Sequence, residues 1–261
     1  MSRQSRKGRF GCLTRNSWLT SRLRDLTPYE LGQGAATVRN CLTSLNYREV
    51  LLNPFDNHPI DYSDNVLDLS GAGQLRFNTE PEIWSASKET ARYYSIGPLF
   101  RREAGTNPLR RLAFFLVDFY QPGPPELLLP VFRQLLDSLG RAGLAVQLSS
   151  LPFEEIEYDP VADGPRIAKT AKPKWLIAYG YDSAHSLFEI DAAGVSSRRE
   201  LFLITPRGFL EIAAFGLTGW NHNPNYRFRS EAFKPPKPDL GQSGMGIGLE
   251  RLLLAEQIIS L

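Results

Sequence analysis

The stretch Gly244-Met-Gly246-Ile-Gly248-Leu-Glu250-Arg251 decides how the rest of the chain is interpreted. Three glycines alternate with other residues, and an acidic and a basic residue follow at the start of an apolar helical pattern. Because glycine has no side chain, backbone at such positions can approach a ligand closely. The alternative interpretation is an ordinary strand-to-helix turn with a charged pair in the first helical turn. In either case the pattern predicts a closing helix over residues 249–259.

The strongest strand pattern lies upstream of this stretch. Residues 93–102 (YYSIGPLFRR) and 112–121 (LAFFLVDFYQ) are rich in residues that favour strands, and a polar, basic loop separates them. This arrangement predicts a long hairpin with an extended tip. A second pair of strands is expected over 200–205 and 209–215, around a Pro-Arg-Gly turn.

Helices are expected on both sides of these strands. Val38, Leu42 and Leu45 fall on one face of a predicted helix over 28–46. Further helices are predicted over 81–93 and 126–142, short strands over 47–55 and 74–78, and a loop over 218–242. A helix, then mostly antiparallel strands, then helices again predicts an α+β fold rather than a doubly wound sheet. We expect one domain over residues 28–261.

Composition bounds the class of protein. With 42% hydrophobic and 22% charged residues among 261, the chain is typical of a globular protein with a full core. The two cysteines form no disulfide framework or metal-binding spacing, which favours a reducing, cytoplasmic setting. No apolar run approaches the roughly 20 residues that a membrane span requires, so no membrane partner is expected.

The net charge of +2 is too small to indicate a nucleic-acid partner, but its distribution is uneven. Seven basic residues precede the first acidic residue, Asp25: Arg3, Arg6, Lys7, Arg9, Arg15, Arg22 and Arg24. Residues 1–27 are therefore expected to form a basic leader. It either contacts a phosphate backbone or is a solvated, partly disordered segment.

Three segments occur in an order that matters as much as their content. The first is a helix followed by Tyr47-Arg-Glu-Val-Leu-Leu-Asn-Pro54-Phe55, the second is Phe100-Arg-Arg-Glu103 with a basic loop and an aromatic pair, and the third is the glycine stretch. Here the sequence resembles the class II aminoacyl-tRNA synthetases, whose three signature motifs have these forms in this order. The resemblance covers roughly residues 30–261 and is sharp only at the three motifs.

The resemblance implies that the protein activates an amino acid with ATP and releases pyrophosphate. Attack of a carboxylate on the α-phosphate brings two anions together, so catalysis depends on positioning and on positive charge. Arginine suits this task because its planar fork holds carboxylate or phosphate at two points and stays charged. By resemblance, Arg101 bridges the α-phosphate and the substrate carboxylate, Glu103 accepts from the adenine amino group, Arg110 reaches the β- or γ-phosphate, and Arg251 holds the γ-phosphate and stacks over adenine. Gly244, Gly246 and Gly248 let the backbone approach the nucleotide.

The aromatic partner of adenine is assigned to Phe114, because the family places it four residues after the basic residue of the loop. Arg111 and Phe115 share that spacing. In a strand the two registers point to opposite faces, so only one of them is right. Ordinary core packing is the alternative for either ring.

Glu211 resembles the family's metal-binding glutamate on the strand before the third motif, where Mg2+ would take oxygen ligands. The position of its usual acidic partner falls near Ile204, and neither Glu200 nor Asp191 has the expected spacing. This departure leaves the number of metal ions open. A plain salt bridge is the alternative role for Glu211.

The segment Thr79-Glu80-Pro-Glu82 resembles the part that binds the substrate's α-amino group in the aspartate, asparagine and lysine subgroup. Glu82 is the preferred ligand and Glu80 the second, since a carboxylate suits an ammonium group; a glutamate favoured by a helix dipole is the alternative. Specificity is expected from the small or apolar residues Ala213, Ala214, Phe215 and Gly216. These favour an uncharged or apolar substrate.

The resemblance also implies partners. Pro54 is expected to contact the active-site sheet of a second subunit, which predicts a two-fold homodimer. The length leaves no room for a separate tRNA-reading domain. The acceptor is expected to be the tRNA 3′ end, as in the compact pyrrolysyl-type enzymes, or a protein, carrier or small amine, as in a synthetase paralogue. An inactive regulatory module is the third possibility, which Arg101, Glu103, Glu211 and Arg251 argue against.

Overall fold

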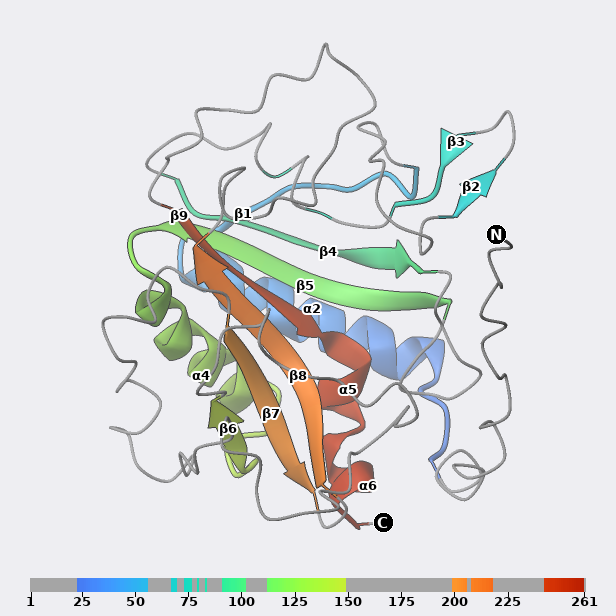
Figure 1. Cartoon of the computed structure of the whole chain (residues 1–261), viewed down its shortest axis with the longest axis vertical. Helices are drawn as coiled ribbons and strands as arrows, with labels where there is room; N and C mark the ends of the chain where they lie inside the picture. The colour runs from blue at the N-terminus through green and yellow to red at the C-terminus, as the bar shows by residue number, and fades with distance from the viewer. Residues whose placement is uncertain are drawn as a thin grey trace, which may run out of the picture.

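The computed structural model describes residues 23–55, 67–69, 73–76, 79, 83, 91–101, 112–148, 199–205, 208–217 and 242–260. A seven-stranded sheet runs through this part of the chain (Figure 1). Its strands, in spatial order, are β1 (Arg48–Glu49), β4 (Tyr93–Phe100), β5 (Ala113–Pro122), β9 (Gln242–Gly248), β8 (Gly208–Leu217), β7 (Arg199–Thr205) and β6 (Val146–Leu148). β1 pairs parallel with β4, whereas the other neighbours are antiparallel. Helices flank the sheet, so the predicted α+β fold is confirmed.

The long hairpin predicted over residues 93–121 is confirmed as β4 and β5. Their register runs from Tyr93 opposite Tyr120 to Phe100 opposite Ala113. The predicted pair formed by β7 and β8 is also confirmed. The tip of the first hairpin, residues 102–111, lies outside the described residues, as do residues 218–241, which include nearly all of the predicted loop.

The glycine stretch forms a strand in the middle of the sheet rather than only a lead into a helix. In β9, Gly246 is opposite Asp118 of β5 on one side and opposite Ala214 of β8 on the other. The predicted closing helix follows directly, but it is divided into α5 (Leu249–Leu253) and α6 (Ala255–Ser260). Because glycine has low strand propensity, the local pattern did not indicate that this stretch would pair on both sides.

Helix α2 (Pro28–Ser44) confirms the first predicted helix. Thr27 caps it, because its Oγ1 accepts from the N–H of Glu30 at 3.2 Å while Glu30 Oε2 accepts from the N–H of Thr27 at 2.9 Å. Pro28 occupies the first helical position, where the N–H that proline lacks would have no intrahelical partner. Val38 and Leu42 are buried on the predicted face.

The helix predicted over 126–142 is shorter than expected. A 3-10 turn, η1 (Pro125–Leu127), leads into α4 (Leu128–Ser138). The chain then reaches Gly140, whose φ of 69° lies in the left-handed region that glycine adopts readily after a helix end. The side chains that the periodicity predicted to be buried include Leu128, Phe132, Leu135 and Leu136, and these are buried.

Only the beginning of the strand predicted over 47–55 is a strand. Beyond β1, the N–H of Val50 donates to Tyr94 O at 2.7 Å, and the chain then runs to a single β-bridge between Phe55 and Leu75. A short hairpin precedes that bridge, formed by β2 (Asp68–Leu69) and β3 (Gly73–Gln74). Of the helix predicted over 81–93, most residues lie outside the described part, and its last residue, Tyr93, begins β4 instead.

The main core lies on one face of the sheet. In Figure 1, α2 and α4 lie behind the sheet, and α5 and α6 contribute Leu249, Leu252, Ala255 and Ile258 to the same core cluster. The strands contribute apolar side chains that include Tyr94, Ile96, Val117, Phe119, Leu201, Leu203, Phe215, Met245 and Ile247. None of the helices in the described part combines the length and apolar character that crossing a membrane requires.

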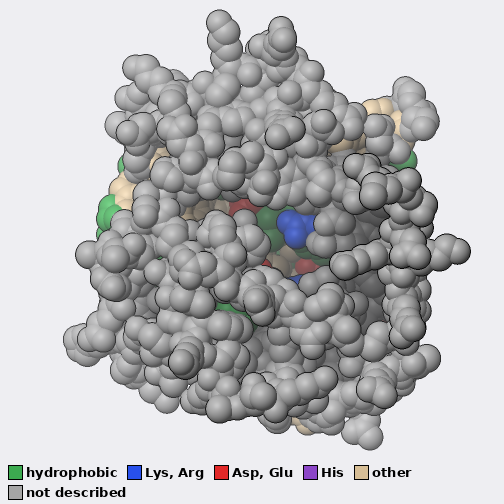
Figure 2. All heavy atoms as spheres, viewed as in Figure 1, with side chains coloured by type: hydrophobic (Ala, Val, Ile, Leu, Met, Phe, Trp, Pro, Cys, Tyr) green, Lys and Arg blue, Asp and Glu red, His purple; other side chains and the backbone are tan. Residues whose placement is uncertain are grey.

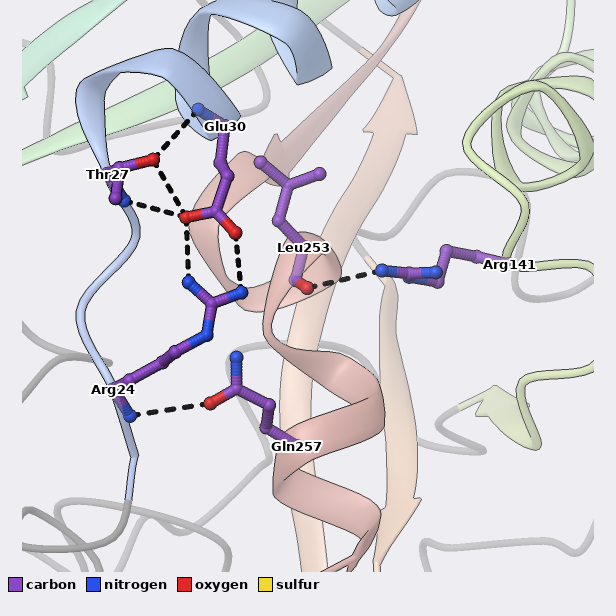
Figure 3. A network of polar contacts seen from close by, with 6 residues as sticks. All are labelled: Arg24, Thr27, Glu30, Arg141, Leu253 and Gln257. Carbon is purple, nitrogen blue, oxygen red and sulfur yellow. Dashed lines mark hydrogen bonds and ion pairs between the residues drawn. The ribbon is translucent and has the colours of Figure 1, made fainter.

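Residues before the boundary expected at residue 28 contact the described core. Leu23 is 5% exposed and belongs to the core cluster. Arg24 forms a two-point ion pair with Glu30, at 2.8 and 2.5 Å, and its backbone N–H donates to Gln257 Oε1 at 3.3 Å (Figure 3). Residues 23–27 therefore connect the start of α2 to α6.

Candidate active site

The register of the central strands divides their residues between two faces, because directly opposed residues on neighbouring strands point to the same side. In β5, Leu116, Asp118 and Tyr120 are opposite Gly248, Gly246 and Gly244 of β9, and the last two glycines are opposite Ala214 and Gly216 of β8. The residues between them, such as Val117, Phe119 and Ile247, belong to the core cluster. The glycines and alanine therefore share the opposite face, here called the open face.

The open face has a floor of very small residues at its centre. Gly244, Gly246, Ala214 and Gly216 offer nothing larger than a methyl group above the sheet. Figure 2 views the molecule from the side away from α2 and α4. It shows a hollow near the middle, in which hydrophobic, basic and acidic side chains lie together. Such a floor leaves room for a ligand that larger side chains would exclude.

Asp118 lies at the centre of the open face and is 4% exposed. A Cβ atom on Gly246 would lie only 2.7 Å from Asp118 Oδ1, so the lack of a side chain at residue 246 makes room for this carboxylate. Asp118 Oδ2 accepts a short hydrogen bond from Thr79 Oγ1, and both residues are buried. Asp118 and Thr79 were not among the expected site residues. An acidic residue inside the apolar run LAFFLVDFYQ is the signal that identifies Asp118 in hindsight.

Thr79 begins the segment that was expected to bind the α-amino group. Its carbonyl accepts from the N–H of Ile83 at 3.2 Å, and Ile83 packs with Tyr93 and Tyr120. Tyr120 is opposite Gly244, so this contact also lies on the open face. The segment is thus held to the open face at Thr79 and at Ile83. Glu80 and Glu82, which lie between them in the sequence, are outside the described residues.

Arg101 directly follows β4 and lies over the ring of Phe114, with its Cζ atom 5.1 Å from the ring centroid. This distance is typical of a cation–π contact. Phe115 packs instead against the core cluster, and its N–H donates to Glu250 Oε1 at 2.7 Å. The two neighbouring rings therefore point to opposite faces, as strand alternation requires. It is Phe114 that lies with Arg101.

A β-bulge brings Glu211 to the open face. Leu201 is opposite Ala213, yet Phe202 is opposite Glu211, so Ile212 is the extra residue of β8. Ile212 and Ala213 both belong to the core cluster. Without the extra residue, alternation would have turned Glu211 toward the core together with Ala213. With the bulge, the side chain of Glu211 is 33% exposed.

Arg251 reaches the same place from α5. Its Nη1 donates to Glu211 O at 2.7 Å and lies 3.4 Å from Glu211 Oε2. The ion pair that the sequence left as an alternative for Glu211 is therefore present. The stem of Arg251 lies beside Gly248, where an added Cβ would be in ordinary contact with Cδ at 3.5 Å. The side chain is 21% exposed, so its guanidinium is anchored but still reaches solvent.

Not every expected residue joins this group. Ala213 and Phe215 both belong to the core cluster, so only Ala214 and Gly216 of the expected specificity residues lie on the open face. Pro54 is exposed, as its expected contact with a second subunit requires. Glu103, Arg110 and Asp191 lie outside the described residues. Within the described residues, no group of three or more His, Cys, Asp or Glu side chains is arranged to hold a metal ion.

No family model and no curated protein matches the chain. Solved structures do. A pyrrolysyl-tRNA synthetase of Desulfitobacterium hafniense matches with a TM-score of 0.51 and 15% sequence identity, over 87% of this chain and 69% of that one. A second crystal structure of pyrrolysyl-tRNA synthetase from the same organism matches with a TM-score of 0.50 and 13% identity, with the same coverage. The chain has the class II aminoacyl-tRNA synthetase fold.

Within the class II fold, the described site residues come from five different elements but gather at one end of the sheet. Arg101 follows the last residue of β4, and Phe114 is the second residue of β5. Gly248 ends β9 opposite Leu116, and Arg251 extends from the helix after it to Glu211 of β8. Sites in which separate strands and a helix end converge bring groups of opposite charge together on a rigid frame.

Proposed function

We propose that the protein activates the carboxylate of an amino acid with ATP, forming an aminoacyl-adenylate and releasing pyrophosphate. The observation that carries this proposal is the composition of the open face. Arg101 and Arg251 lie at the same end of a glycine floor, with the ring of Phe114 under one and the carboxylate of Glu211 beside the other. This combination suits a ligand that has both a planar base and several phosphates.

The proposed chemistry needs fixed positive charge where two anions meet. Arg101 would hold the α-phosphate and the substrate carboxylate, and Arg251 would hold the γ-phosphate. Two contacts support these roles, because the ring of Phe114 orients one guanidinium and the carbonyl of Glu211 anchors the other. Preorganised charges of this kind lose little free energy to reorganisation during the reaction. Phe114 would thus orient Arg101 in addition to its expected stacking on adenine.

Magnesium fits the donor set of this face. Mg2+ usually takes one or two protein carboxylates and completes its shell with phosphate oxygens and water. Glu211 offers one partly exposed carboxylate on the open face. Glu200 is opposite Ala214, a residue of the same floor, in the backbone register. When bound, the ion would neutralise charge on the phosphates.

The proposed acceptor is the 3′ end of a tRNA, and the proposed assembly is a homodimer. Tyr29, Leu51 and Phe55 are 74%, 83% and 40% exposed, and Pro54 is exposed between the last two. Exposed apolar side chains of this kind around the first motif support an interface with a second subunit. The basic residues before Leu23 are the proposed contact with tRNA phosphates.

The decisive experiment is amino-acid-dependent exchange of pyrophosphate into ATP across a broad panel of amino acids. Wild type should exchange with at least one of them. Arg101→Ala should lower turnover about 100- to 1000-fold, since removal of one transition-state donor commonly costs that much. Arg251→Ala should weaken nucleotide binding by about 2–3 kcal/mol. Arg39→Ala is the matched control, because Arg39 forms a partly exposed ion pair with Glu49 on the helix side. No exchange with any amino acid would refute the proposal.

The identity of the acceptor is tested by a truncation that removes only residues before the described core. Deleting residues 1–22 keeps Leu23 and Arg24 in place, so exchange should persist. Binding to tRNA should weaken, and its dependence on salt should flatten, by about 0.9 in the log–log slope for each phosphate that the protein no longer neutralises. If full-length protein binds RNA only weakly and without preference for tRNA, the acceptor is a protein, carrier or small amine instead.

A further inference from the structure

Arg76 is fully buried, with 0% of its surface exposed, and it holds three successive backbone carbonyls. Its Nε donates to Asn53 O, its backbone N–H donates to Pro54 O at 2.9 Å, and its Nη2 donates to Phe55 O at 3.0 Å. The planar fork of arginine makes this possible, since its donors are spaced to reach acceptors on either side of one peptide.

Within the described residues, the segment held in this way is exposed. Leu51 is 83% exposed, and Asn53, Pro54 and Phe55 are exposed as well. Their side chains therefore bury little apolar surface in the chain described here. The bridge between Phe55 and Leu75, next to Arg76, belongs to the same attachment.

Arg76 also reaches β4 through its own carbonyl. The N–H of Phe100 donates to Arg76 O at 2.8 Å, and the next residue, Arg101, donates its N–H to Leu112 O at 3.0 Å. Residue 76 lies just after β3, and in the view of Figure 1 β3 lies above the arrowhead of β4. Arg76 thus fixes Phe100, the last residue of β4, from one side. The next residue, Arg101, carries the guanidinium that lies over Phe114.

We propose that Arg76 is a positioning residue for Arg101. Arg76 fixes the end of β4 against the segment 53–55, and that attachment sets where the backbone of Arg101 leaves the sheet. A residue with a purely structural role would stabilise the fold without this directional effect. For its activity readout the proposal rests on the proposed function, but amide protection at Phe100 and Arg101 tests it without any activity.

The variants are Arg76→Met, which keeps a long apolar stem, and Arg76→Lys, which keeps the charge but has a single nitrogen in place of the fork. The control is Arg92→Met. Arg92 directly precedes the other end of β4, and its Nη1 donates to Leu45 O at 3.1 Å. Both arginines thus connect one end of the same strand to a backbone carbonyl, but only Arg76 is bonded to the residue that precedes Arg101.

In hydrogen exchange, Arg76→Met should increase the exchange of the amides of residues 100 and 101 by at least tenfold, with Val117 and Phe119 still protected. Arg92→Met should leave residues 100 and 101 unchanged. Unaltered exchange at 100 and 101 in a folded Arg76→Met variant would overturn the proposal. If Arg76→Met does not fold, the same comparison with Arg76→Lys decides, with a smaller increase expected.

In pyrophosphate exchange, Arg76→Met should lower kcat roughly 10- to 100-fold, since small misplacements of a reacting group have effects of that size. The KM for ATP should change by less than a factor of about three if Arg251 is undisturbed. In the background of Arg101→Ala, the same change should have little further effect, because Arg76 acts through Arg101. Additive losses would overturn the positioning role. Absence of pyrophosphate exchange in the wild type would count against the proposed function alone. The hydrogen exchange of the amides at residues 100 and 101 would still test the positioning role of Arg76.

Discussion

The two faces of the central strands carry opposite kinds of side chain. On the helix side, β5 and β9 place Val117, Phe119, Met245 and Ile247, each at most 1% exposed. On the open face, the same strands place Asp118 opposite Gly246, with Gly244 and Gly248 at the neighbouring positions. One face is filled with large apolar side chains, whereas the other has a row of glycines beside a buried carboxylate, with Tyr120 at one end of that row.

This difference assigns two tasks to the two faces of one sheet: the core face stabilises the fold, and the open face leaves space for a ligand. The core face supplies apolar burial, which is the main favourable contribution to folding. The open face gives up that contribution, because glycine buries no side chain and weakens a strand. A sheet with a filled core face can carry such residues on its other face where a ligand needs the space. Changes on the two faces should therefore have different effects.

The largest effect on stability is expected at Phe119, on the core face. Its side chain is fully buried, and its ring meets that of Tyr47 edge to face at 5.8 Å between centroids. Phe119→Ala should lower the free energy of unfolding by about 3–5 kcal/mol in urea denaturation. Exchange activity per folded molecule should stay close to wild type. A loss below about 1 kcal/mol would show that this face is not the main core.

Much of the core face was readable from the sequence. The apolar runs of β4, β5, β7 and β8 predicted both hairpins, and the periodicity of α2 and α4 predicted their buried sides. Short-range patterns of this kind depend on neighbouring residues in the sequence, so they can be recognised without knowledge of the fold. The strand β9 was missed because its pairing depends on two partners far away in the chain rather than on its own residues.

Phe114 and Phe115 are neighbours of identical size on opposite faces of the sheet, so their substitution separates effects on stability from effects on activity. Phe115→Ala should destabilise the protein by about 2 kcal/mol, since its ring is half-buried against the core. Phe114→Ala should leave stability within about 0.5 kcal/mol but lower exchange roughly tenfold, because the ring no longer orients Arg101. Chemical denaturation and exchange kinetics measure both variants. Equal effects of the two substitutions on stability would contradict the assignment of faces.

A smaller effect is expected at Gly246, with Gly248 as its matched control. A methyl group at residue 246 would press on Asp118 Oδ1 at 2.7 Å, whereas one at residue 248 would only touch the stem of Arg251 at 3.5 Å. Gly246→Ala should therefore cost about 1–2 kcal/mol of stability through overpacking and disturb the contact with Thr79. Gly248→Ala should be close to neutral in thermal unfolding. The reverse order would mean that Asp118 does not occupy this space.

The parts of the site that sequence reasoning missed share one cause. The bulge at Ile212 adds a single residue, and nothing in FLEIAAF marks it, although it decides that Glu211 faces Arg251 rather than the core. Asp118 was hidden in an apolar run for the same reason. In both cases the orientation depends on pairing with a neighbouring strand, which motif spacing does not contain. Motifs predicted Arg101, Glu211 and Arg251 as site residues, and the strand register shows on which face of the sheet they lie.

The smallest effect is expected at the ion pair of Arg24 and Glu30, before and at the start of α2 (Figure 3). The hydrogen bonds from Arg24 and Thr27 lower the pKa of Glu30 to about 2, whereas an ordinary glutamate has a pKa of about 4.3. A carboxyl group with a lowered pKa stabilises the fold above its unfolded-state pKa, and this contribution is lost as the pH falls through the folded-state value. Wild type should therefore exceed Glu30→Gln in melting temperature by a constant small margin above about pH 5, and the margin should shrink between about pH 4 and pH 2. The pair is exposed to solvent, so the margin should also narrow with added salt.

Arg24→Gln should remove most of the same pH dependence, while pyrophosphate exchange at neutral pH should not change in either variant. A margin that grows on acidification would show that Glu30 is not held ionised by Arg24 in the folded protein.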